Sequence, residues 1–318
     1  MKYSGIGGQA VIEGIMMMKG EDYAVAVRRP DKEIEVKKDT YQSITKKAKI
    51  LQLPFVRGVF RFADSMIIGM RSLSYSASFF EDDEDAEPGK FEQLLDRVFG
   101  EKLESAIMAA VLVISFILAI GIFMLLPLGI ANLFKGVITS DHLMAVLEGV
   151  IRIAIFIIYI KLVSRMEDIR RTFMYHGAEH KCINCVEHGH PLTVKYVRES
   201  SKEHKRCGTS FILIVMVISI LMFMVIRVDT IWMRILSRII LVPVIAGISY
   251  EVLQRAGRSN SKFMDLVSRP GMWMQGLTTK EPDDSMIEVA IAATEAVFDW
   301  REYLTENFPG WEKQLEES

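Results

Sequence analysis

Four long apolar runs are the dominant pattern along the chain. They cover about residues 106–134, 144–163, 208–226 and 231–253. Each run is long enough to cross a bilayer, which takes roughly 20 residues in a helix. Four such runs in a chain of 318 residues are hard to bury without lipid. The pattern therefore predicts a mainly α-helical membrane protein, with four transmembrane helices and a small mixed α/β cytoplasmic region.

The distribution of lysine and arginine predicts the orientation. The segment between the first two runs, 135–142, has one lysine and no arginine, whereas the segment between the second and third runs has many of both. Lysine and arginine are enriched on the cytoplasmic side of membrane proteins. The N-terminus also lacks the basic and then apolar pattern of a signal peptide. We therefore expect a multi-pass protein of the bacterial cell membrane with both termini in the cytoplasm.

These patterns divide the chain into five consecutive parts. The expected parts are an N-terminal cytoplasmic region (1–100), transmembrane helices 1 and 2 (101–165), a cytoplasmic loop rich in histidine and cysteine (166–207), transmembrane helices 3 and 4 (208–255) and a C-terminal cytoplasmic tail (256–318).

The N-terminal region has three local patterns. Residues 23–27 and 33–36 alternate with period two on either side of a Pro-Asp pair, which predicts a β-hairpin. The glycine-rich segment 5–14 lacks the lysine of a phosphate loop, so a tight turn or close backbone packing is expected. Residues 53–75 have apolar side chains at helical spacing with arginines between them. This amphipathic helix is expected either to lie in the membrane interface or to pack on the cytoplasmic region.

Two further segments have recognisable local patterns. Six of the nine residues in 81–89 are acidic, and this segment is expected to form a solvated linker. Ser285 and Glu288 have the spacing of a capping box, which predicts a helix from Met286 to about Tyr303.

The candidate chemistry is concentrated in one window. Five of the six histidines and all three cysteines lie between His176 and Cys207. Three cysteines are too few for a disulfide framework, and thiols stay reduced on the expected cytoplasmic side. Metal binding is therefore favoured over disulfide formation. The formal net charge of −2 gives no reason to expect a nucleic acid as a partner.

Within this window, residues 176–180 form an H-x-x-E-H pattern. On a helix, His176 and His180 are about 40° apart on one face. Two imidazoles at this spacing hold one zinc ion in many proteins. Glu179 lies about 60° from His176 on its other side. It is therefore the candidate catalytic residue, a general base that activates water at the metal.

A complete site needs further ligands, and His204 and Cys207 are the best candidates. All four side chains would give a closed tetrahedral zinc site, and three of them with water would give an open one. The metal is expected to be zinc or another divalent ion. The lower-ranked ligands are Glu187, Cys182 and Cys185, with His188 and His190. The alternative is that these residues only form hydrogen bonds within a compact loop domain.

Charged residues inside the apolar runs are a second signal. Glu148 and Arg152 are four residues apart in the second run, which is a favourable order for an ion pair. Arg234, Arg238 and Glu251 belong to the fourth run. Charges within a membrane usually face the bundle interior or water, so a polar cavity is one interpretation. Structural pairing at the membrane interface is the other, and the outer position of the two arginines slightly favours it.

Four segments together resemble the YqhQ family of bacterial membrane proteins. They are Gly7–Gly14, Tyr175–Lys181, Arg206–Phe211 and Ala246–Glu251. Members of the family are often labelled metal-dependent enzymes. The resemblance therefore implies metal chemistry near His176, Glu179, His180, His204 and Cys207. This chain has Lys205 where the family usually has a proline, and Cys182 does not belong to the family pattern.

Three classes of function fit the sequence. The first is a membrane-bound, metal-dependent hydrolase that acts on a peptide or lipid at the cytoplasmic face. The second is a non-enzymatic scaffold or assembly factor in which a metal or polar cluster is structural. The third is a small transporter or channel that uses the intramembrane charges, although the chain shows no inverted repeat. The expected partners are the lipid bilayer and either other membrane proteins or further copies of the chain.

Overall fold

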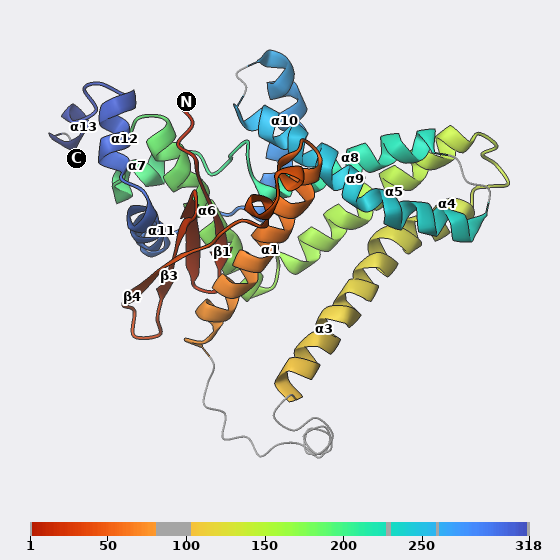
Figure 1. Ribbon diagram of the computed structural model, residues 1–318, viewed down its shortest axis with the longest axis horizontal. Helices are drawn as coiled ribbons and strands as arrows, with labels where there is room; N and C mark the ends of the chain where they lie inside the picture. The colour runs from red at the N-terminus through yellow and green to blue at the C-terminus, as the bar shows by residue number, and fades with distance from the viewer. Residues whose placement is uncertain (1, 81–102, 227–229, 259–260, 317–318) are drawn as a thin grey trace. The chain divides into compact units, whose positions relative to one another are not determined.

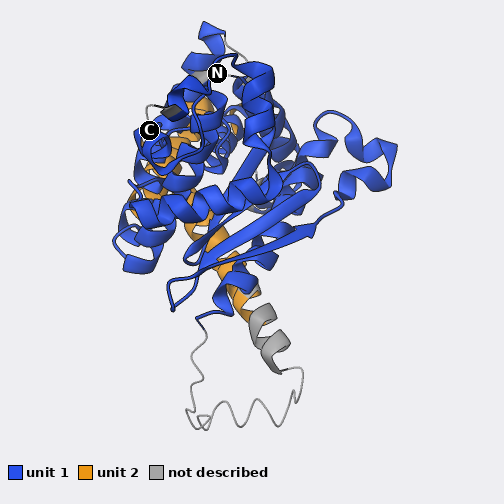
Figure 2. Ribbon diagram, turned by 90° about the vertical axis from the view of Figure 1, so that its left-hand side faces the viewer, with its two compact units in different colours: residues 1–80, 160–222, 226–318 blue, residues 81–159, 223–225 orange. Residues whose placement is uncertain are grey.

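The computed structural model describes residues 2–80, 103–226, 230–258 and 261–316. The chain separates into two compact units, shown in different colours in Figure 2. Unit 1 comprises residues 1–80, 160–222 and 226–318, and unit 2 comprises residues 81–159 and 223–225. The acidic segment expected to be a linker, 81–89, lies outside the described residues.

Unit 1 contains a four-stranded antiparallel meander, β1(Ile6–Val11), β2(Gly14–Lys19), β3(Asp22–Arg28) and β4(Ile34–Thr40). The predicted hairpin is confirmed, because β3 pairs with β4 with Val27 opposite Glu35. The glycine-rich segment forms a second hairpin, β1 with β2, which the sequence analysis did not predict. Its close backbone packing is confirmed, since a Cβ atom on Gly14 would lie 2.3 Å from the carbonyl oxygen of Ala26.

Helices cover both faces of this sheet (Figure 1). The side chains of β2 alternate in direction, so Ile15 and Met17 join one apolar cluster and Met16 joins another. The first cluster is completed by α6(Glu167–Glu187) and α11(Asp284–Val297). The second contains Ile68 of α1(Val56–Ala77). The predicted amphipathic helix is therefore confirmed as α1, and part of it packs on the sheet.

The structure corrects the prediction for the C-terminal helix. The N-cap of α11 is Asp283, whose carboxylate accepts a hydrogen bond from Met286 N at 3.0 Å. The Ser285 hydroxyl donates to the same carboxylate, so Ser285 is not the cap. The helix also ends at Val297, and Asp299 caps a separate helix, α12(Trp300–Asn307).

The remaining elements are short or belong to the apolar runs. Unit 1 also contains η1(Ile44–Lys47), η2(Lys49–Gln52), α7(Val194–Glu199), α10(Lys262–Thr278) and α13(Lys313–Glu316). The apolar runs form α3(Leu103–Ile120), η4(Gly121–Leu125), α4(Leu126–Asn132), α5(Asp141–Val163), α8(Gly208–Val225) and α9(Ile231–Arg258).

Within the described residues, four helical segments are long and apolar enough to cross a membrane. They are Val113–Asn132, Asp141–Val163, Gly208–Val225 and Ile235–Gly257. The mainly helical fold, with four candidate membrane-spanning helices and a small sheet, is thereby confirmed. The second span does not continue as one helix into His176, because α5 ends at Val163 and α6 begins at Glu167.

Candidate metal centre

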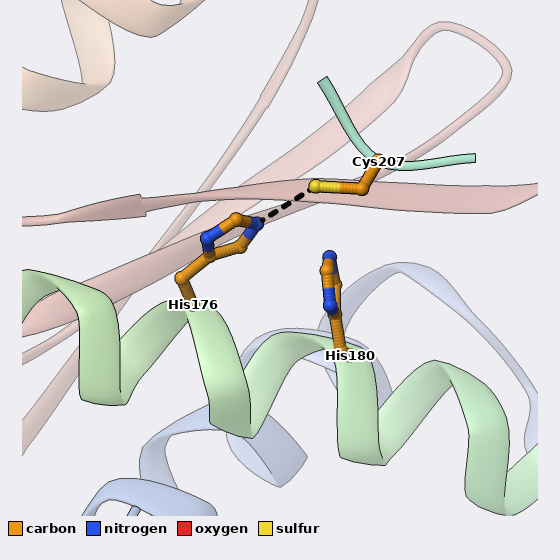
Figure 3. A group of neighbouring side chains, drawn as sticks. All are labelled: His176, His180 and Cys207. Carbon is orange, nitrogen blue, oxygen red and sulfur yellow. Dashed lines mark hydrogen bonds between the residues drawn. The ribbon is translucent and has the colours of Figure 1, made fainter. Parts of the chain in front are cut away.

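Three of the predicted ligands come together in unit 1. His176 and His180 lie one turn apart on α6, with ring centroids 4.4 Å apart. Cys207 directly precedes α8 and faces both rings (Figure 3). One ligand atom from each residue lies within 4.8 Å of the other two. This group could hold a metal ion, and it joins residues 31 positions apart in the sequence.

Backbone carbonyl groups select the tautomer of both imidazole rings. His176 Nδ1 lies 3.0 Å from Thr278 O, and His180 Nδ1 lies 2.7 Å from Lys202 O. A carbonyl oxygen only accepts hydrogen bonds, so each Nδ1 carries the proton. In the neutral form of each ring, the lone pair is then on Nε2, the atom that a metal would bind. The same arrangement orients the ligating histidines of many metal sites.

Cys207 is held at the start of α8. Its Sγ atom lies 3.2 Å from His176 Nε2 and accepts a hydrogen bond from the backbone N–H of Thr209 at 3.4 Å. Cys207 is thus the N-cap of α8, and a helix N-terminus stabilises negative charge on a nearby ligand. The site is largely enclosed, since His180 is 1% exposed and Cys207 is also buried.

The glycine of the H-x-x-E-H pattern allows this packing. A Cβ atom on Gly177 would lie 2.0 Å from the carbonyl oxygen of Lys280. Lys280 N in turn donates to Phe173 O on α6. The absence of a side chain at Gly177 therefore lets the segment after α10 run against α6, and this contact brings Thr278 O to His176.

Glu179 is buried between α6 and the sheet. Its carboxylate accepts a hydrogen bond from the backbone N–H of Gly8, and its Oε2 atom has no hydrogen-bond partner among the described residues. Burial raises the pKa of Glu179 to about 7, although His176 and the Gly8 N–H both favour the charged form. Its oxygens do not belong to the group of three ligand atoms. Glu179 therefore lies beside the candidate ligands and is not among them.

His204 does not join this group in the structure. It is buried, and its Nε2 atom lies 3.6 Å from the Glu187 carboxylate. Burial, with the nearby charge of Arg206, lowers the pKa of His204 to about 4 despite the opposing effect of Glu187. Gln275 holds its backbone by two hydrogen bonds, from His204 N at 2.8 Å and to His204 O at 2.7 Å. The ring faces a second buried polar cluster.

Glu187 is the centre of that second cluster. Its carboxylate accepts hydrogen bonds from the Ser4 backbone N–H, the Ser4 hydroxyl and Arg206. Burial favours the neutral acid, but His204, Arg206 and Ser4 together lower the pKa of Glu187 to about 2. Arg206 and Ser4 were not among the predicted site residues, because nothing local in the sequence pairs them with Glu187.

Cys182 and Cys185 lie in the apolar core of unit 1 and not at the candidate site. Burial raises the pKa of the Cys185 thiol to about 12 and raises that of Cys182 as well. Cys185 Sγ donates to Pro191 O at 3.3 Å. Both side chains act here as small buried apolar groups.

Two of the predicted charges in the second span pair on one helix. Arg152 donates to Glu148 at 2.7 Å, so the expected ion pair on α5 is present. Glu251 of α9 accepts two hydrogen bonds of 2.7 Å from the guanidinium of Arg57 on α1. Arg238 is buried. The side chain of Arg234 lies outside the described residues.

Comparisons with known proteins give a family but no activity. Residues 53–300 match the family model described as "Protein of unknown function (DUF1385)". The chain is 34% identical over 286 residues to "Uncharacterized protein YqhQ" of Bacillus subtilis (strain 168), covering 90% of this chain and 89% of that protein. No solved structure matches. The extent of both matches shows that this chain belongs to the DUF1385 family together with YqhQ.

Proposed function

We propose that His176, His180 and Cys207 bind zinc or a similar divalent metal, and that the protein is a membrane-bound metal-dependent hydrolase. The observation that carries the proposal is that the rings of His176 and His180 and the Cys207 Sγ atom converge on one point. Carbonyl groups bind the Nδ1 atom of each ring, which leaves Nε2 for the metal. Zinc favours nitrogen and sulfur ligands of this kind. Three protein ligands leave a fourth position for water or substrate, which is typical of catalytic sites.

Glu179 is the proposed general base. It lies on α6 between the two histidines in sequence, it is buried, and one carboxylate oxygen is not used by other described groups. A metal at such a site activates water and polarises a carbonyl or phosphoryl group of the substrate. Glu179 would take the proton of the attacking water and return it to the leaving group. The substrate would be a peptide or lipid at the membrane surface, because Cys207 directly precedes a candidate span.

A structural metal is the second candidate. The three ligands come from α6 and from the residue before α8, so an ion bound to them would connect two helices. In that case the protein would be a scaffold or an assembly factor, and the metal would only stabilise its fold.

Metal analysis of purified protein tests the site itself. We expect about one metal ion per chain in the wild type, and loss of that ion in His180→Ala and Cys207→Ala. The matched control is His188→Ala, because His188 lies in the same segment but is exposed. Metal-free protein after purification with added zinc would contradict the proposal, as would equal occupancy in the control and the ligand variants.

The substitution Glu179→Gln distinguishes the two candidates. It keeps the shape of the side chain and removes none of the three proposed ligands. If Glu179 is a general base, the variant should keep its bound metal and its melting temperature. Its rate of reaction should fall by roughly 10²- to 10⁴-fold. The readout is complementation of a deletion strain, alongside bound metal and thermal melting. Full complementation with full metal occupancy would reject the hydrolase and favour the structural metal.

A further inference from the structure

Two helices of unit 1 expose apolar faces beside the candidate spans α8 and α9. One is α1, and the other is α10. Both helices contact α9 (Figure 1). Neither is among the four candidate spans, and each has one exposed apolar face and one face packed on protein. Their exposed faces remain to be explained, since large exposed apolar patches mark interaction sites.

The buried face of α1 fixes its position. A Cβ atom on Gly58 would lie 2.7 Å from Tyr250 Cβ and 3.1 Å from Gly247 Cα, so α1 packs directly on α9. At the border between this face and the exposed one, the half-exposed Phe62 stacks on Phe211 of α8 with ring centroids 5.7 Å apart. The Arg57–Glu251 ion pair adds a charged contact to the same junction. In Figure 1, α1 runs across the direction of α9 and not along it.

The outer face of α1 is mainly apolar from Val56 to Leu73. Met66 is 52% exposed, and its neighbours on the same face are exposed to a similar extent. This face contains Val56, Phe62, Met66, Ile67, Met70 and Leu73. At about 100° per residue these side chains fall within an arc of roughly 140°. The helix therefore has the strong amphipathic character of an interfacial helix.

The helix α10 has the same division of faces. Ser268, Met274 and Gln275 are buried, and a Cβ atom on Gly271 would lie 2.6 Å from Ser210 Oγ at the start of α8. Phe263, Leu266 and Trp273 are exposed at a spacing of three and seven residues. Trp273 is 62% exposed, and tryptophan is enriched at membrane–water interfaces.

Basic residues surround both apolar faces. The segments 44–77 and 254–278 together contain ten lysines and arginines but only two acidic residues. The basic residues are Lys46, Lys47, Lys49, Arg57, Arg61, Arg71, Arg255, Arg258, Lys262 and Arg269. Of the two acids, Asp64 is buried against Ser43, and Asp265 pairs with Lys205. Arg57 and Lys46 pair with Glu251 and Glu21, which lie outside these segments, and the remaining excess of positive charge is complementary to an anionic membrane surface.

We infer that α1 and α10 are interfacial helices that lie in the surface of an anionic bilayer around the ends of α8 and α9. These candidate spans also expose apolar side chains, which include Ile212 and Val244. The inference does not depend on metal binding. It does have a consequence for the candidate site, because Thr278 at the end of α10 accepts the hydrogen bond of His176. The helix that would lie in the headgroups therefore also orients a candidate ligand.

Spin labels on the full-length protein test this inference. The protein would be reconstituted in vesicles of phosphatidylcholine and phosphatidylglycerol, with a label at Met66→Cys or Leu266→Cys. The matched controls are Ser65→Cys and Arg269→Cys, which are exposed positions on the same helices outside the apolar faces. The native cysteines are all buried, so unmodified protein provides the labelling background.

The expected result is a difference in collision partners. Labels at Met66→Cys and Leu266→Cys should collide with oxygen and be protected from a water-soluble nickel complex, whereas the control labels should show the reverse. In vesicles of phosphatidylcholine alone, the labels at the two test positions should lie at a shallower depth in the bilayer. Equal nickel access at test and control positions would overturn the inference. Dipolar broadening that disappears on dilution with unlabelled protein would also overturn it, because the faces would then be covered by a second copy of the chain.

Discussion

At the scale of single residues, glycines decide how closely the candidate base approaches the sheet. A Cβ atom on Gly8 would lie 2.6 Å from Met16 O and 3.0 Å from Glu179 Cγ. A Cβ atom on the neighbouring Gly7 would have no contact within 4 Å. The glycine-rich segment thus contributes a hydrogen-bond donor and a space for Glu179, and its role differs from that of a phosphate loop.

The substitution Gly8→Ala should therefore destabilise the protein, by about 1–3 kcal/mol, because the added methyl group is forced into occupied space. Gly7→Ala is the matched control in the same strand and should change stability far less. Thermal melting of both variants in detergent measures the difference. Equal melting temperatures for Gly8→Ala and Gly7→Ala would show that the close approach at Gly8 does not matter.

The buried His204 predicts a dependence of stability on pH. Its pKa is about 4 in the folded protein, below its usual value of 6.5, so the folded state resists protonation. Its contribution to stability is present above pH 6.5 and is lost as the pH falls from 6.5 to 4. The loss of Glu187 ionisation follows at lower pH, between 4.5 and 2.

Between pH 7 and pH 4, the melting temperature of the wild type should therefore fall relative to that of His204→Gln, whose side chain does not titrate. The comparison is needed because the raised pKa of Glu179 has the opposite effect on stability over this range and is present in both proteins. Parallel curves for the two proteins would contradict the assignment of the pH dependence to His204.

Part of the site could be predicted from the sequence and part could not. The spacing of His176 and His180 fixes their common face on any helix, so their pairing is a local property. Cys207 could be predicted as a partner because it directly precedes an apolar run. The carbonyl groups of Thr278 and Lys202 lie 102 and 22 residues from the histidines that they orient. No local pattern encodes such contacts. His204 contacts Glu187 and does not join the three candidate ligands, and this contact is not encoded by a local pattern either.

At the scale of elements, hydropathy identified the spans well because length and composition are sufficient for that purpose. Helix ends were harder to predict. Asp283 and Ser285 are both good caps, so residue type alone does not select Asp283, whose carboxylate accepts the hydrogen bond from Met286 N in the structure. The hairpin β1–β2 was missed because its strands contain glycine and methionine where strand patterns favour β-branched residues.

The ion pair on α5 gives a prediction at this scale. Glu148→Gln should destabilise the protein by a few kcal/mol, on the order of 3–5, since it leaves the buried Arg152 charge without its partner carboxylate. The double variant Glu148→Gln with Arg152→Met should recover much of this loss. Thermal melting of the three proteins in detergent is the measurement. A single variant as stable as the wild type would show that the pair contributes little.

At the scale of the whole molecule, the orientation in the membrane determines the chemistry available to the candidate site. On the cytoplasmic side Cys207 stays reduced and free to bind a metal, whereas on the outer side of the membrane it would be exposed to oxidation. The basic residues around α1 and α10 favour the cytoplasmic side, for the same reason that basic loops do. Orientation, metal binding and the interfacial helices are thus linked, although each can be tested by itself.

Cysteine accessibility in intact cells tests the orientation. Thr139→Cys lies between the first two spans, and Glu199→Cys is an exposed position at the end of α7 in unit 1. A membrane-impermeant maleimide should label Thr139→Cys from outside and should label Glu199→Cys only after the membrane is permeabilised. The native cysteines are buried, so the wild type should give little background. Labelling of Glu199→Cys in intact cells would reverse the orientation. It would place Cys207 on the oxidising side, where a reduced thiolate ligand would be difficult to maintain.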